Sequence, residues 1–248
     1  MTYPSLTIGL YNRKRDEKKL QSLMAEAQEL SKSQDRIKMG ILAQKLSTIA
    51  YGKGFTANDR QKHLERYGCA TYNSEVLTKI SSTALNKRGV IEIGAGNGQW
   101  ARVLASSQYK FDIISFDNMY SLPLNTSLYH ARTKPAHDFF SKAIMQGDER
   151  VLLKTSPAFK EIVGRVLLIV FPDSGDMARN CLRNYKEASE ENDTFIYVGE
   201  GRGGANGDEA FFDMLEGGEW ELESVTDMVP FGVNKGFEKM FVFNRRRL

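Results

Sequence analysis

The fold is decided by residues 90–100, which read VIEIGAGNGQW. A short apolar run containing Glu92 leads into three alternating glycines, after which a helical pattern resumes. Glycine permits a positive φ and lets a ligand approach the bare backbone, while the N-terminus of a helix offers free N–H groups. The stretch therefore predicts a strand, a tight turn and a helix. This arrangement holds an adenosine-type cofactor at the carboxyl end of the first strand of an open α/β sheet.

The glycine pattern alone leaves more than one interpretation open. Counted from Gly96, the segment also satisfies the G-x-G-x-x-G/A pattern of dinucleotide-binding proteins, a weak signal when it stands alone. Glu92 favours a different cofactor, because a carboxylate repels a pyrophosphate but attracts an ammonium or a sulfonium group. A glycine-rich turn without a ligand is the third interpretation, and the acid and the downstream residues weigh against it.

The pattern E-x-G-x-G-x-G resembles motif I of the class I S-adenosylmethionine-dependent methyltransferases. The resemblance extends over about residues 66–244 and implies S-adenosyl-L-methionine as the cofactor. It implies that Glu92 serves the charged amino-acid end of the cofactor. The glycines that would shape the turn are Gly94, Gly96 and Gly98.

Further cofactor contacts are expected where the next two strands end. Asp117 closes the apolar segment 111–117, about 20 residues beyond the glycines, where an acid can accept both ribose hydroxyls. A helix cap is the alternative role for this acid, and Asn118 follows it as a further candidate. Segment 143–148 resembles the short third strand and turn of the family, and either Gln146 or Asp148 is expected to contact the adenine.

The intervening segment gives no metal prediction. Its candidate ligands are His130, His137 and Asp138, and their spacing fits no metal signature. Loop or solvent-facing histidines are the preferred interpretation, so we predict no metal site.

The methyl acceptor is expected beside the fourth strand. Residues 165–171 begin with Arg165 and continue as an apolar run without alternation, which predicts a central strand buried on both faces. Amino-methylating members of the family carry an Asp/Asn-Pro-Pro-aromatic turn here, but this chain has Phe171, Pro172 and Asp173 instead. The departure puts an adenine N6 or glutamine-type mechanism in doubt. Asp173 remains a candidate base or orienting group, with Phe171 and Pro172 as substrate contacts.

Two more catalytic candidates lie in residues 199–207, which contain five glycines, one acid and one base. The segment follows the predicted strand 194–198, at the sheet edge that carries chemistry in open α/β folds. Glu200 and Arg202 are therefore expected on the substrate side, a flexible connection being the alternative. Tyr67 and Tyr72 precede the first strand, in a region that commonly folds over the cofactor in this family. They are candidate lid residues, with plain aromatic packing as the alternative.

The resemblance and the apolar patterns together predict the architecture. We expect an α/β fold with a seven-stranded, mostly parallel sheet, helices on both faces and an antiparallel last strand. Apolar residues at helical spacing within 16–34 and 37–49 predict an N-terminal helical extension, residues 1–65, before the cofactor-binding domain, residues 66–248. These two helices are expected to pack on the main domain or to cap its cofactor cleft.

Charge is unevenly distributed along the chain. Residues 1–88 hold 16 Lys and Arg against 8 Asp and Glu, whereas residues 89–248 hold 18 against 23. A basic N-terminal third joined to an acidic body can steer a polyanion such as RNA. Lysine-rich helices that are merely solvated are the alternative, and the same two options apply to the basic end at 245–247. No apolar run approaches the roughly 20 residues that a membrane span needs.

The functional expectation is an S-adenosylmethionine-dependent methyltransferase that acts on RNA or on an RNA-associated protein. The alternatives are a small-molecule methyltransferase and a catalytically inactive binding or assembly protein of a ribonucleoprotein. Two cysteines without metal spacing, and an N-terminus without a signal pattern, favour the cytoplasm. Organellar import stays open, and the pattern predicts no oligomeric state.

Overall fold

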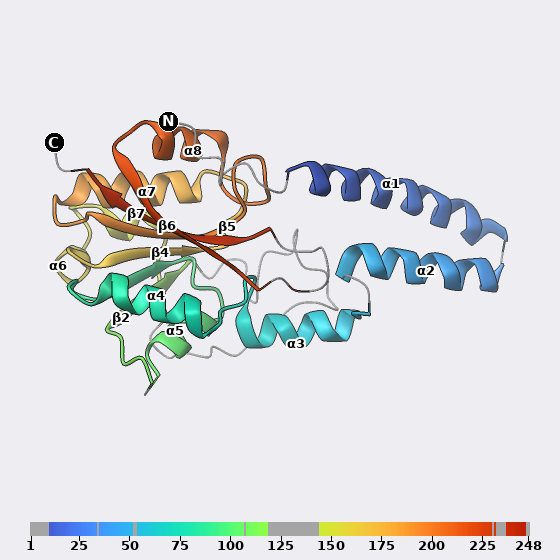
Figure 1. Cartoon of the computed structure of the whole chain (residues 1–248), viewed down its shortest axis with the longest axis horizontal. Coiled ribbons are helices and arrows are strands. Elements are labelled where there is room, and N and C mark those ends of the chain that lie inside the picture. The colour runs from blue at the N-terminus through green and yellow to red at the C-terminus, as the bar shows by residue number, and fades with distance from the viewer. Residues whose placement is uncertain are drawn as a thin grey trace.

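A computed structural model describes residues 10–33, 35–51, 54–106, 108–118, 144–229, 231 and 237–246. Its centre is a seven-stranded sheet with the order β3-β2-β1-β4-β5-β7-β6 (Figure 1). The strands are β1 Val90–Ile93, β2 Ile113–Asp117, β3 Ile144–Gln146, β4 Val166–Val170, β5 Thr194–Gly199, β6 Trp220–Asp227 and β7 Lys239–Arg245.

The strand directions confirm the predicted α/β architecture. The first five strands pair in parallel, and β7 enters antiparallel between β5 and β6. The strand order and directions are those that the resemblance to the methyltransferases implies. The chain order reverses between β1 and β4, so a crevice is expected at their carboxyl ends, where ligands bind in open α/β sheets.

Helices cover both faces of the sheet. They are α4 Ser74–Ala84, α5 Gln99–Leu104, η2 Glu149–Leu152 (a 3-10 helix), α6 Phe159–Ile162, α7 Met177–Ala188 and α8 Glu209–Glu216. In β4, Val166 and Leu168 join the core beneath α4 and α5, whereas Leu167 and Ile169 join the core beneath α7 and α8. Apolar and polar residues therefore do not alternate in β4 because both faces of the strand are buried, as the sequence predicts.

Three helices precede the sheet: α1 Leu10–Ser33, α2 Arg36–Tyr51 and α3 Ala57–Tyr67. The α1–α2 hairpin, residues 10–51, consists of two antiparallel helices that lie side by side, with Leu23 and Leu42 buried (Figure 1). It projects from the side of the body at which the parallel strands end. We expected these helices to pack on the domain or to cap its cleft, but they pack mainly on each other.

Helix α3 was not expected from the sequence, and it runs across the expected boundary between residues 65 and 66. It begins with a capping box in which the Thr56 side chain accepts from the Asp59 N–H and the Asp59 carboxylate accepts from the Thr56 N–H. Such a reciprocal pair satisfies two backbone donors that a helix start leaves free. Its apolar positions are too few to produce a helical stripe.

Helix α4 begins at Ser74 and ends at Ala84, five residues before Gly89. Asn73 is its N-cap, accepting from the Val76 N–H at 2.8 Å. Gly89 has φ 135° just before β1, and a Cβ there would overlap the carbonyl oxygen of Asp112. This glycine is therefore required by the close approach of the strands and does not end the helix. Within the described residues, no helix has the length and apolarity needed to span a membrane.

Candidate functional site

The glycine turn after β1 has the geometry that the sequence predicts. Gly94, Gly96 and Gly98 have φ values of 78°, 56° and 82°, in the region that residues with a Cβ rarely adopt. Gly98 is the N-cap of α5. The N–H groups of Gly94 and Ala95 both donate to the Phe116 carbonyl, at 2.8 and 3.0 Å. The turn is thus fastened to the end of β2.

Asp117 lies against this turn. Its Oδ2 accepts a hydrogen bond from the Gly96 N–H at 2.9 Å, so the carboxyl ends of β1 and β2 meet as predicted. Asn118 follows it, and Gln146 is exposed and lies opposite Asp117 in the register of β2 and β3. The structure therefore brings these three polar side chains to one edge.

Asp148 has a local structural role beside that edge. It caps η2 and is paired with Arg150, whose Nε lies 2.9 and 3.0 Å from its two carboxylate oxygens. These hydrogen bonds hold the pKa of Asp148 below its usual range. The carboxylate keeps lone pairs for a further donor, and its contact with adenine stays a prediction.

Glu92 is buried beneath the turn, with 1% of its surface exposed. Its Oε2 accepts a hydrogen bond from the Ser115 hydroxyl at 3.0 Å. Burial raises the pKa of this carboxyl to about 7, and the nearby Asp117 charge adds to the increase. No lysine or arginine of the described chain forms an ion pair with it. A cation bound near the turn would therefore be stabilised by the ionised form.

Met177, the first residue of α7, also contacts the turn. A Cβ added to Gly94 would lie 2.6 Å from the Met177 methyl group. The absence of a side chain at Gly94 thus makes room for the Met177 side chain. Nothing in the local sequence around Met177 predicts this contact.

The loops after β4 and β5 are joined by Asn206, which is 1% exposed. Its Nδ2 donates to the Pro172 carbonyl at 2.6 Å, and its Oδ1 accepts from the Glu200 N–H at 2.9 Å. The Gly207 N–H also donates to the Asp173 carbonyl at 2.8 Å. Sequence reasoning missed Asn206 because it looked for charged groups in this loop.

The β4 loop begins in an unusual backbone conformation. Phe171 has φ 50°, and this backbone conformation costs free energy for a residue with a Cβ. Residues held in such conformations cluster at functional sites. Its N–H donates to the Val198 carbonyl at 2.7 Å. Asp173 follows on the surface and accepts from the Gly175 N–H at 2.9 Å through Oδ1. Of the three predicted catalytic side chains, Asp173 is the exposed one at this edge.

Glu200 and Arg202 make contacts within their own region of the fold. Glu200 Oε2 accepts from the Ala205 N–H at 2.7 Å. Arg202 forms ion pairs with three carboxylates of α8 and lies over the Phe212 ring at 5.5 Å. The carboxylates are those of Glu209 at 2.5 Å, Asp213 at 2.9 Å and Glu216 at 3.2 Å. Both side chains thus have structural partners within the protein, whether or not a methyl acceptor binds. Their catalytic roles stay predictions.

The candidate lid is attached to the first turn of α5. The rings of Tyr67 and Tyr72 lie 5.1 Å apart, and Tyr72 lies 5.4 Å from Trp100, both edge to face. Trp100 Nε1 donates to the Ala70 carbonyl at 3.3 Å, and Gln99 Nε2 donates to the Leu64 carbonyl at 2.9 Å. Both tyrosines therefore lie close to the glycine turn in the fold, and their action as a lid stays a prediction.

Three further rings extend this cluster away from the turn. His63 lies 5.2 Å from Tyr67 and 4.7 Å from Phe231, which in turn lies 4.9 Å from Phe55. Burial and the nearby Arg60 lower the pKa of His63 to about 4, so its ring is neutral at pH 7. Neither contact was predicted, because helix α3 was not expected from the sequence and Phe231 lies far along the chain from His63.

The remaining candidates from the sequence are accounted for as follows. His130, His137, Asp138 and Arg247 lie outside the described residues. Arg245 pairs with Glu190 and Glu219, and Arg246 pairs with Glu221. No cluster of potential metal ligands occurs among the residues that the structure describes.

No protein-family model and no curated protein matches the chain. Solved structures resemble it at low identity. A protein of the NADB-Rossmann superfamily from Streptococcus agalactiae is 12% identical, with a TM-score of 0.43 over 73% of this chain and 72% of its own. Sp1610 of Streptococcus pneumoniae, a candidate tRNA (m1A22) methyltransferase, is 11% identical, with a TM-score of 0.44 over 71% and 72%. TrmK of M. capricolum, solved with S-adenosyl-homocysteine, is 11% identical, with a TM-score of 0.44 over 71% and 70%. At these identities the similarity concerns the fold alone.

Proposed function

We propose that the protein is an S-adenosylmethionine-dependent methyltransferase with RNA, or an RNA-associated protein, as its acceptor. The observation that carries the cofactor assignment is the meeting of two acids at the glycine turn. Asp117 is bonded to the Gly96 N–H, and Glu92 is buried beneath the same turn. Asp117 is suited to accept hydrogen bonds from ribose hydroxyls. Glu92 is suited to lie near a cation.

The residues at this edge fit S-adenosylmethionine better than a dinucleotide. Asp117 would accept from the ribose, and Gln146 and Asp148 are the candidates beside the adenine. The carboxyl of Glu92 would be stabilised by an ammonium or sulfonium centre, whereas a pyrophosphate near it would be repelled. When bound, the cofactor supplies an electrophilic methyl group that the acceptor attacks in line.

The contribution of the chain to the transfer is alignment, which can account for a large part of a rate enhancement. The β4 and β5 loops, joined through Asn206, flank the crevice beside the cofactor turn. Asp173 is exposed there and would orient the acceptor or remove its proton. Phe171 and Pro172 begin the same loop, so they are the adjacent candidates for contact with the acceptor.

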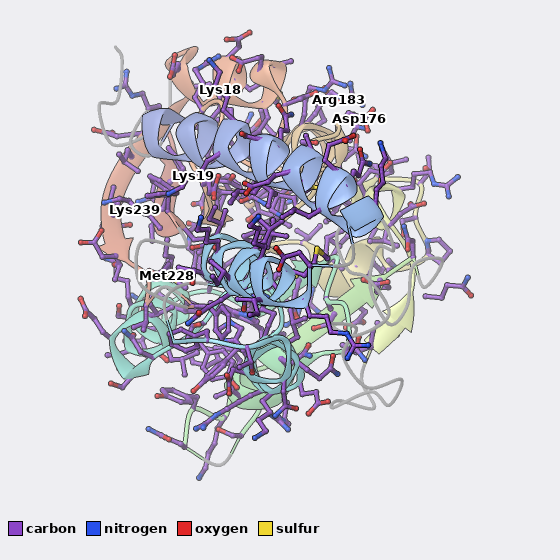
Figure 2. The ribbon with its side chains drawn as sticks, turned by 90° about the vertical axis from the view of Figure 1, so that its right-hand side faces the viewer. Lys18, Lys19, Asp176, Arg183, Met228 and Lys239 are labelled. Atoms are coloured by element: carbon purple, nitrogen blue, oxygen red, sulfur yellow. The ribbon has the colours of Figure 1, made fainter. Side chains whose placement is uncertain are left out.

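RNA is favoured as the acceptor by the charge of the hairpin. Helices α1 and α2 contain nine lysines and arginines against four acidic residues. Figure 2 views the molecule from the hairpin side, with Lys18 and Lys19 on α1 and Lys239 of β7 on the same flank of the view. A basic element at the edge that carries the cofactor turn would attract phosphates to the crevice.

The cofactor assignment is tested by calorimetric titration with S-adenosylmethionine, S-adenosylhomocysteine and NAD. We expect the first two to bind and NAD to bind weakly or not at all. Tighter binding of NAD would overturn the assignment.

The acceptor is tested by transfer of a radiolabelled methyl group to total RNA, total protein and a small-molecule extract. Label in RNA or in an RNA-associated protein supports the proposal. Label in the extract alone would identify a small-molecule enzyme. Cofactor binding without transfer to any fraction would favour a non-catalytic binding protein.

A further inference from the structure

Six aromatic rings form a continuous series that we call the aromatic ladder. Its members, in spatial order, are Phe55, Phe231, His63, Tyr67, Tyr72 and Trp100. Successive ring centroids lie between 4.7 and 5.4 Å apart. The ladder begins between α2 and α3, at the base of the hairpin, and ends in the first turn of α5, next to the glycine turn. It therefore connects the basic hairpin with the predicted cofactor site.

The ladder differs from an ordinary core cluster in its exposure. Trp100 is buried, but the other five rings are all partly exposed to solvent. Aromatic rings of a folded core are normally covered, whereas rings at interfaces keep one side accessible. The ladder is therefore half embedded in the protein, and five of its six residues keep part of their surface accessible.

Two arginines accompany the exposed rings. The Arg60 guanidinium lies over Phe231 at 5.2 Å, and that of Arg66 lies over Tyr67 at 5.0 Å. Within the part of the chain that the structure describes, neither guanidinium forms an ion pair. Stacked cations of this kind can contact a phosphate while the neighbouring ring contacts a base. His63 is neutral at pH 7 and adds an uncharged ring between the two arginines.

We infer that the aromatic ladder binds an unpaired RNA strand and leads it from the α1–α2 hairpin to the methyl-transfer site. The inference rests on the proposed function, which it deepens by naming the form of the RNA. Partly exposed rings with adjacent arginines suit unpaired bases, because the faces of bases within a duplex are already stacked. The positive charge of the hairpin complements the phosphates of the same strand.

The test measures the anisotropy of a fluorescent single-stranded RNA of mixed sequence at fixed salt. The same RNA annealed to its complement is measured in parallel. Phe231→Leu and Tyr67→Leu remove a stacking face but keep apolar volume, and Arg60→Gln removes one cation. Each leucine variant is expected to weaken single-strand binding by roughly 5- to 150-fold, the range for loss of one base–aromatic stack. The matched control is Tyr109→Leu, a partly exposed tyrosine outside the ladder.

The outcomes separate the ladder from the proposed function. Weaker single-strand binding in Phe231→Leu and Tyr67→Leu, with S-adenosylmethionine affinity retained in Phe231→Leu, supports the inference. The protein could instead bind RNA through the ladder but bind no S-adenosylmethionine. That result would support RNA binding by the ladder and overturn the proposed methyltransferase function. Unchanged RNA affinity in folded Phe231→Leu and Tyr67→Leu overturns the inference, as does duplex binding as tight as single-strand binding. If a leucine variant fails to fold, Arg60→Gln decides, and its unchanged affinity counts against the ladder.

Discussion

Glu92 shows at the scale of one residue how the fold holds a group that is unfavourable for stability. Its carboxyl is buried with one hydroxyl partner, and its pKa is raised from 4.5 to about 7. The folded state therefore binds more protons than the unfolded state between these two values. Stability from this group falls as the pH rises from about 4.5 to 7, and the loss is complete above that window.

Glu92→Gln is expected to stabilise the ligand-free protein at pH 8, where the wild type carries a buried charge. The gain is on the order of 3 kcal/mol at full ionisation, from about 1.4 kcal/mol per pKa unit. At pH 5 the advantage should shrink to less than about 1 kcal/mol, because the folded-state carboxyl of the wild type is then protonated. Urea denaturation at both pH values measures the difference, with Glu187→Gln on the exposed face of α7 as the control. An equal difference at both pH values would contradict the buried charge.

Asp117 is expected to matter to the cofactor more than to the fold. Asp117→Ala removes the acceptor for the ribose hydroxyls and should weaken S-adenosylmethionine binding by about 1–3 kcal/mol, roughly 5- to 150-fold in Kd. Asp117→Asn keeps an oxygen that can accept from the Gly96 N–H. This variant therefore tests whether the residue acts by holding the glycine turn or by binding the ribose. Calorimetry on both variants gives the affinities. Unchanged affinity in a folded alanine variant would mean that the acid only fastens the turn.

At the scale of elements, the β4 and β5 loops behave as one unit because Asn206 joins them. Asn206→Ala would leave the Pro172 carbonyl and the Glu200 N–H without this partner. Leaving a buried polar group unpaired costs about 1–3 kcal/mol, so we expect the loops to loosen. Hydrogen exchange should increase in residues 172–176 and 199–207, and methyl transfer should fall further than cofactor affinity. Asn180→Ala on α7 is the control, and unchanged exchange in both loops would argue against a clamp.

The elements also show which parts of the site the sequence could predict. The turn at 94–98 could be predicted because the glycine spacing is a local signal. Asp117 could be predicted because it ends an apolar segment of the sequence. The partners of Arg202 were not predictable, since they depend on how a glycine-rich loop returns to α8. The contact between His63 and Phe231 joins distant segments and leaves no periodic signal. Helix α3 was missed because only its capping box, Thr56 with Asp59, marks it.

At the scale of the whole molecule, our proposal places phosphate binding on the α1–α2 hairpin, apart from the predicted methyl-transfer site. Lys18→Glu with Lys19→Glu is expected to weaken RNA binding and to reduce its salt dependence by about one unit of slope per lost phosphate contact. Affinity for S-adenosylmethionine should stay unchanged, because both lysines lie on the projecting hairpin (Figure 2). The control with an equal change of net charge is Lys154→Glu with Lys160→Glu, two exposed lysines before and on α6, a helix on the far side of the body in Figure 1. An equal loss in both proteins would indicate that net charge alone acts.

The position of β7 sets an order of assembly that differs from the order of synthesis. This strand, made last of the seven, lies between β5 and β6, and within the described chain β6 pairs with β7 alone. Phe243 and Phe241 of β7 stack on Phe195 and Tyr197 of β5 at 5.9 and 5.8 Å. Until residues 239–245 leave the ribosome, β5 therefore has a bare edge, which is a template for intermolecular pairing, and its Phe195 and Tyr197 rings lack their β7 neighbours. A nascent chain halted before β7 should need a chaperone to stay out of aggregates.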